Sequence, residues 1–175
     1  PRLYRPTFRS RLFEQLDAAR ECPVIWVTGP PGAGKTTLLG TWLDARKLPH
    51  IWYQIDQDDA DASTFFYYLR DAGQRLAPSG PALPLLTAEF LNDVAGFGRR
   101  FFRSLFARLG TGLVVFDNYQ DVGDDALLHD ILAAAIQEVP TGTSIFVLSR
   151  SSAPPAFAAA ALRGEIANLE WDDLR

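Results

Sequence analysis

The residues between positions 29 and 37 could bind a polyphosphate. They read Gly-Pro-Pro-Gly-Ala-Gly-Lys-Thr-Thr and follow an apolar run that is typical of a buried strand. The segment fits the pattern G-x-x-x-x-G-K-[ST], in which glycines let backbone amides converge on one point at a helix N-terminus. The residues expected to bind a nucleotide here are Gly29, Gly32, Ala33, Gly34, Lys35, Thr36 and Thr37.

The side chains of this loop have distinct expected roles. Lys35 should reach the β- and γ-phosphates, and the hydroxyl of Thr36 should complete the coordination of a Mg²⁺ ion. Thr37 could contact the α-phosphate. The alternative is a glycine-rich turn that binds nothing. It is disfavoured because the buried strand before the loop and the apolar helix face after it both fit a phosphate loop.

Two later strands end in residues that could complete the site. The apolar run 112–117 predicts a strand buried on both faces, and its last residue, Asp117, would emerge at the edge where parallel sheets hold their ligands. Asp117 is therefore the candidate partner of Thr36 at Mg²⁺. A second buried strand, 144–149, precedes Arg150, which would aim a cation at the γ-phosphate unless it forms a surface salt bridge instead.

A run of four aspartates, Asp56, Asp58, Asp59 and Asp61, follows the predicted strand 51–55. These carboxylates could form a Mg²⁺ site. We favour a solvated N-terminal turn, because acids between a strand and a helix complement the helix dipole.

Apolar residues at helical spacing predict the helices that would cover the sheet. One runs over 62–76, with Tyr68 among its inward residues, and another over 87–109. The aromatic face of the second could dock a partner, but packing against the sheet is favoured. A further helix should open at Asp124 or Asp125.

Composition limits the class of protein. The chain has 175 residues, one cysteine, a formal net charge of −4 and no apolar run long enough to span a membrane. These values favour a single cytoplasmic domain without a nucleic-acid surface, since such surfaces are usually basic. Because the chain starts without Met and stops within a patterned segment, we expect residues 1–175 to be one domain excised from a longer regulator.

The order of these segments resembles P-loop ATPases whose Walker A and Walker B strands are separated by another strand. More narrowly, the chain resembles the ATPase domain of the signal-transduction ATPases with numerous domains (STAND), in the branch of MalT-type, LuxR-related transcriptional activators. The residues that carry this resemblance are Arg9, Arg11, Leu12, Trp52, Ile55, Asp56, Asp59, Asp61, Phe65, Tyr68, Leu69, Asp117, Asn118, Tyr119, Ser149, Arg150, Pro154 and Pro155.

The resemblance implies a three-layer α/β/α fold around a mostly parallel sheet of five strands. The implied strand order is 51–55, 112–117, 144–149, 23–28 and 166–170. It also implies an ATP/ADP switch that uses Mg²⁺, works with other domains of the same chain and could self-associate when ATP is bound. A pre-loop arginine of that branch places Arg9 near the nucleotide, although a solvated N-terminal cap remains the alternative.

One departure from the family concerns catalysis. Members usually carry a second acid after the Mg²⁺ aspartate, and this chain has Asn118, which can orient a water but cannot accept its proton. With Lys35, Asp117, Asn118 and Arg150 as the catalytic set, we expect slow hydrolysis or none, unless Asp121 or a partner's residue substitutes. The alternative function is a small P-loop nucleotide or small-molecule kinase.

Overall fold

The structure, a computed structural model, describes residues 4–124 and 126–171, and only the backbone of residues 4–9. Its centre is a parallel sheet of five strands in the order β2-β3-β4-β1-β5, which confirms the predicted order. The strands are β1 (Val24–Thr28), β2 (His50–Gln54), β3 (Leu113–Asp117), β4 (Ile145–Ser149) and β5 (Ile166–Glu170). β5 has its predicted bounds. The predicted ranges 51–55, 112–117, 144–149 and 23–28 differ by one residue at an end or at both, because strand pairing rather than apolar pattern decides the terminal residues.

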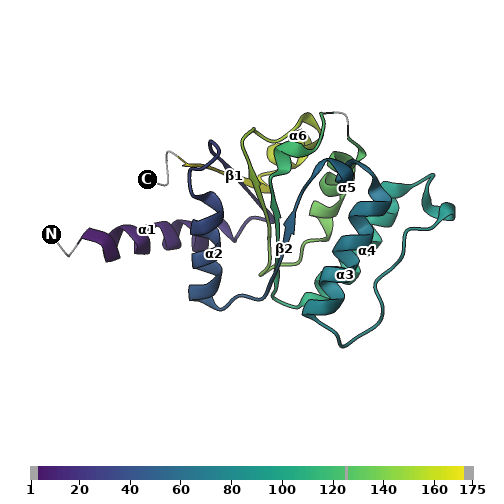
Figure 1. The fold of residues 1–175 in the computed structure, drawn as a ribbon, viewed down its shortest axis with the longest axis horizontal. Helices are drawn as coiled ribbons and strands as arrows, with labels where there is room; N and C mark the ends of the chain where they lie inside the picture. Colours follow the sequence, from purple (N-terminus) through teal and green to yellow (C-terminus); the bar gives the residue numbers. More distant parts are fainter. Residues whose placement is uncertain (1–3, 125, 172–175) are drawn as a thin grey trace.

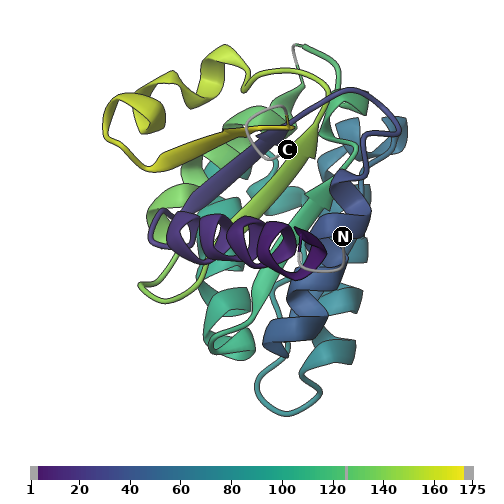
Figure 2. The ribbon, with the colours of Figure 1, turned by 90° about the vertical axis from the view of Figure 1, so that its left-hand side faces the viewer.

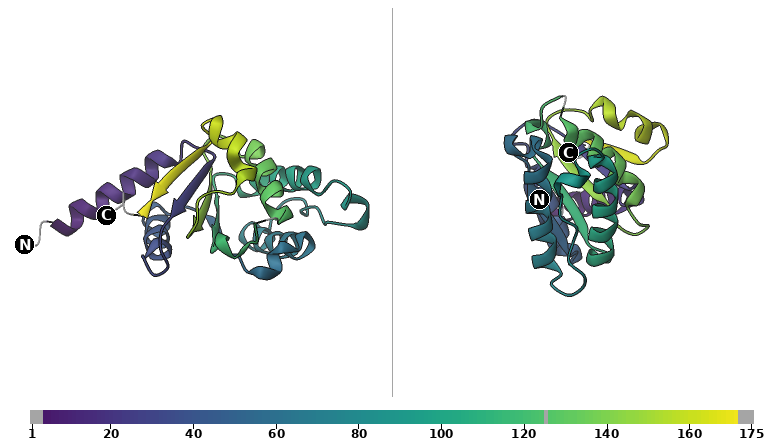
Figure 3. Two further views of the ribbon diagram at one scale, coloured as in Figure 1. Left: turned by 90° about the horizontal axis from the view of Figure 1, so that it is seen from above. Right: turned by 90° about the vertical axis from the view of Figure 1, so that its right-hand side faces the viewer.

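Helices cover both faces of the sheet. Figure 1 shows α1 and α2 on one side of the strands and α3, α4 and α5 on the other. In Figure 2, α1 crosses in front of the strands, and Figure 3 shows its N-terminal half extending beyond them. The helices are α1 (Tyr4–Ala19), α2 (Lys35–Arg46), α3 (Ala62–Leu76), α4 (Val94–Leu109), α5 (Leu127–Ala135) and α6 (Ala158–Leu162). Within the described ranges, no helix is long and apolar enough to cross a bilayer.

Alternate residues of the central strands fill two separate cores. Trp26 and Phe116 belong to the core shared with α3, α4 and α5, whereas Ile25 and Val115 belong to the core shared with α1 and α2. All four are completely buried. Strands with apolar residues on both faces are what a parallel sheet between two helical layers requires, and the fixed sheet holds the strand ends that form the site.

The predicted helix over 87–109 is interrupted. A short 3-10 turn, η2 (Ala88–Phe90), follows Thr87, and α4 begins only at Val94. The side chain of Asp93 accepts a hydrogen bond from the backbone N–H of Gly96 at 3.0 Å and so caps the helix. Aspartate is a better N-cap than threonine, which explains why the helix begins there. Its aromatic face packs into the core, as favoured.

Two further helix predictions were wrong in detail. Tyr68 is 56% exposed and stacks edge-on against Tyr67, while Phe65, Phe66 and Leu69 form the buried face of α3. α5 begins at Leu127 and its N-cap is Ala126, so Asp124 does not open it. Asp125 lies outside the described residues.

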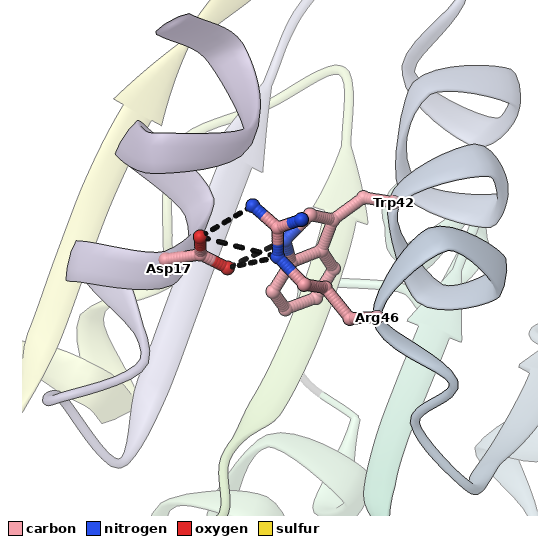
Figure 4. Close-up of polar contacts among 3 residues, drawn as sticks. All are labelled: Asp17, Trp42 and Arg46. Atoms are coloured by element: carbon pink, nitrogen blue, oxygen red, sulfur yellow. Dashed lines mark hydrogen bonds and ion pairs between the residues drawn. The ribbon is translucent and has the colours of Figure 1, made fainter. Parts of the chain in front are cut away.

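α1 is attached to α2 through one carboxylate (Figure 4). Asp17 accepts a hydrogen bond from the indole Nε1 of Trp42 at 2.9 Å, and it forms an ion pair with Arg46 at 2.7 Å. The hydrogen bond from Arg46 lowers the pKa of Asp17. Since α2 starts at the glycine loop, this contact ties the N-terminal helix to the element that carries Lys35 and Thr36.

We expect Asp17→Asn to reduce the free energy of unfolding at pH 7 by roughly 0.5–1 kcal/mol, because the pair is partly exposed. The pKa of Asp17 is lowered in the folded state, so its contribution is present above the ordinary value of 3.8 and is lost as pH falls through the folded pKa. Urea unfolding of both proteins at neutral and acidic pH measures this difference. Asp44→Asn, an exposed change on α2, is the control. A difference that does not shrink at acidic pH would contradict the prediction.

Candidate functional site

The glycine loop joins the end of β1 to the start of α2. Gly32 and Gly34 have φ angles of 73° and 93°, a left-handed conformation that glycine adopts without strain. Gly34 is the N-cap of α2, and no side chain of the described residues caps this end. The N–H groups of the first helical turn have no acceptor inside the helix, so they are available to an anion.

Gly29 is a glycine for a different reason. Its φ lies outside the left-handed range, but a methyl group at this position would lie 2.6 Å from Cβ of Trp171. The indole of Trp171 also reaches Gly34, where a methyl group would lie 3.6 Å from its ring. The residue after β5 is therefore packed directly against the loop. Sequence reasoning missed Trp171, because nothing in a single sequence indicates which residue approaches Gly29.

The ammonium of Lys35 is held by the loop itself. It donates hydrogen bonds to the carbonyl oxygens of Gly29 at 2.7 Å and Pro30 at 2.9 Å. Burial lowers the pKa of Lys35, the Asp117 carboxylate opposes this shift, and the positive charge of Arg150 adds to it. Lys35 is thus a partly desolvated cation between the loop, β3 and the end of β4.

Thr36 and Asp117 meet although 81 positions separate them in the sequence. The hydroxyl of Thr36 donates to Oδ2 of Asp117 at 3.1 Å, and the backbone N–H of Asn118 donates to Oδ1 at 2.9 Å. Asp117 is only 6% exposed. An alcohol and a carboxylate oxygen side by side fit the oxygen donors that Mg²⁺ uses in phosphate sites.

One cavity of about 560 Å³ brings together most of the predicted site residues. Its lining residues from the prediction are Gly32, Ala33, Gly34, Lys35, Thr36, Thr37, Asp117, Asn118 and Arg150.

The side chain of Arg9 lies outside the described residues. Arg150 is exposed and makes no ion pair with any described residue, which argues against the salt-bridge alternative. Gln120 also lines the cavity and was missed, because an isolated glutamine carries no sequence signal.

Three of the four aspartates after β2 act as caps. Asp56 and Asp59 form a capping box, in which Asp59 also accepts a hydrogen bond from the hydroxyl of Tyr53 at 2.5 Å. Burial raises the pKa of Asp59. Asp61 caps α3 through the N–H of Ser63. The structure supports the capping alternative, because Asp56, Asp59 and Asp61 each accept a hydrogen bond from a backbone N–H group.

Comparison with known sequences finds relatives among transcriptional regulators. No model of a protein family matches the chain. It is 27% identical over 177 residues to the HTH-type transcriptional regulator MalT of Yersinia enterocolitica, and 28% identical over 178 residues to MalT of Yersinia pestis. The chain is homologous to MalT. The alignments cover 99% of the chain but only 19% of each MalT, so the homologous segment is a small part of that regulator. The resemblance to MalT-type regulators is confirmed.

A solved structure matches the fold. A chain in the structure of Drosophila ORC bound to DNA superposes with a TM-score of 0.53 at 18% identity, covering 95% of this MalT homologue and 46% of the ORC chain. At this identity the match concerns the fold alone. It agrees with the three-layer α/β/α architecture of P-loop NTPases expected from the sequence.

Proposed function

We propose that this domain binds ATP and ADP together with Mg²⁺ and serves as the nucleotide-dependent switch of a longer transcription regulator. The observation that carries the proposal is the 3.1 Å contact between Thr36 and Asp117 beside the glycine loop. A loop with free helical N–H groups and two oxygen donors at its rim has the chemistry of a magnesium–polyphosphate site. Homology to a transcriptional regulator supports the regulatory role.

Each part of the site would have one task. The N–H groups from Gly32 to Thr36 would hold the phosphate oxygens, that of Ala33 after it releases the carbonyl of Pro30. Lys35 would exchange its loop carbonyls for the β- and γ-phosphates. Mg²⁺, held by Thr36 and Asp117, would neutralise phosphate charge. Arg150 would approach the terminal phosphate. We assign adenine as the base from the family resemblance, and no Asn-Lys-x-Asp motif for guanine occurs in the chain.

Hydrolysis should be slow. Asn118 follows the magnesium aspartate and is held in a left-handed conformation with φ 57°, but its amide cannot accept a proton from water. Asp121 lines the same cavity and is the candidate base within the chain. An amide can still orient the attacking water, as glutamine does in some GTPases. Release of phosphate without an acceptor, rather than transfer to a nucleoside monophosphate, would distinguish the switch from a small kinase.

Thermal unfolding with ADP tests the binding proposal. At 100 times its dissociation constant, ADP with Mg²⁺ should stabilise the folded domain by about 2.7 kcal/mol, if it does not bind the unfolded chain. AMP at the same concentration as ADP is the control, because it lacks the β-phosphate that Lys35 and the loop should hold. A melting curve that is indifferent to ADP, or shifted equally by AMP, would overturn the assignment of the loop.

A further inference from the structure

The ends of β3 and β4 separate where they border the phosphate cavity. Their pairing stops at Phe116 and Val147, whereas β4 stays paired with β1 as far as Ser149 and Thr28. Past this point, the last two residues of β4, Leu148 and Ser149, are paired with β1 only. Any group that spans the gap fixes the position of the residues after β4 relative to Asp117.

The side chain of Gln120 spans this gap. Gln120 lies in the 3-10 turn η3 (Tyr119–Asp121), directly after Asn118 and Tyr119. Its Oε1 accepts a hydrogen bond from the backbone N–H of Arg150 at 3.1 Å, and its Nε2 lies 3.5 Å from Oδ1 of Asn118. One amide therefore joins the two loops that contribute Asn118 and Arg150 to the cavity.

The backbone contact matters because no ion pair within the described part of the chain holds the side chain of Arg150. Arg150 is exposed, lines the cavity together with the glycine loop, and pairs with no described carboxylate. Its positive charge is felt at Lys35, whose pKa it helps to lower after the larger effect of burial. Arg150 therefore lines the same cavity as Lys35 and Asp117, the two residues that the proposed function assigns to the terminal phosphate and its Mg²⁺. ADP lacks that phosphate.

We propose that Gln120 is a positioning residue that fixes Arg150 through its backbone N–H and thereby makes the site distinguish ATP from ADP. The proposal rests on the proposed nucleotide-binding function and specifies how the site recognises the terminal phosphate of ATP. Gln120 need not touch the nucleotide. Its amide supplies the acceptor that a neighbouring strand would supply if the pairing of β3 and β4 continued.

The test is Gln120→Met, which keeps the length of the side chain and removes its acceptor. Calorimetry on the whole domain should show ATP binding weakened about tenfold, the value of one lost hydrogen bond at a positioned group, with ADP affinity unchanged within about twofold. The control is Gln137→Met, since Gln137 is an exposed glutamine that pairs with Glu165 away from the cavity. This change should leave the ratio of the two affinities as in the wild type.

A double-mutant cycle with Arg150→Ala shows whether Gln120 acts through Arg150. In that background, Gln120→Met should change ATP affinity no further, because the group that it positions is gone. Additive losses overturn the proposal. So does an equal loss of ATP and ADP binding with a lower melting temperature of the free domain, which indicates a purely structural role. An unchanged affinity ratio in Gln120→Met overturns the inference alone, whereas a wild type that binds neither nucleotide overturns the proposed function as well.

Discussion

Lys35→Ala should abolish binding of magnesium–nucleotide complexes, with a loss of at least about a hundredfold in affinity for both ATP and ADP. Lys35 belongs to the loop and its ammonium is partly desolvated, so its charge-assisted hydrogen bonds to phosphate oxygens should be among the strongest in the site. Among the described residues, its ammonium bonds only to carbonyls of the loop, so its removal should change stability little. Calorimetry with both nucleotides measures the loss.

The second lysine of the chain provides a matched control. Lys47 follows α2 in a left-handed conformation with φ 52°, which asparagine tolerates. Lys47→Asn therefore removes the same charge without backbone strain and should leave nucleotide affinity near that of the wild type. If both variants lost affinity equally, general electrostatic attraction rather than the loop would explain the binding. Unchanged affinity in Lys35→Ala would contradict the proposed site.

The parts of the site that have a recognisable local sequence pattern could be predicted. The spacing of the glycines predicted the loop. An apolar run that ends in a carboxylate predicted that Asp117 lies at the rim of the loop. The order of the strands came from the family resemblance rather than from any local pattern. Local propensity failed where two capping residues competed, because Thr87 has a weaker tendency than Asp93 to begin a helix that both could start.

The contacts that depend on tertiary structure could not be predicted. Gln120 meets the N–H of Arg150 across 30 positions of sequence, and only the separation of β3 and β4 leaves that N–H without a strand partner. Trp171 meets Gly29 because β5 lies beside β1 in the sheet. Neither residue type marks such a role by itself, since Gln and Trp also occur at many positions without function.

Gly29→Ala should damage the loop even though φ of Gly29 lies outside the left-handed range. The added methyl group would lie 2.6 Å from Cβ of Trp171 and 3.3 Å from Cδ of Lys35. Since the first neighbour is the base of a side chain, no rotamer change relieves the contact, and the loop or the end of β5 must move. Overpacking of this kind costs about 1–3 kcal/mol of stability. Displacement of Lys35 should weaken ATP binding as well, and urea unfolding and calorimetry measure the two effects.

Three further substitutions separate this steric effect from a general intolerance of alanine. Gly40 lies in α2, and apart from that helix's own backbone no described atom is within 4 Å of the position of an added Cβ. Gly40→Ala should therefore stabilise the domain by about 0.5–1 kcal/mol through helix propensity.

In the Gly29→Ala background, Trp171→Ala should not restore the loop, because alanine keeps the Cβ that contacts the new methyl group. Trp171→Gly removes this Cβ and should restore nucleotide affinity in part. Equal rescue by both would mean that the indole ring, rather than Cβ, limits position 29.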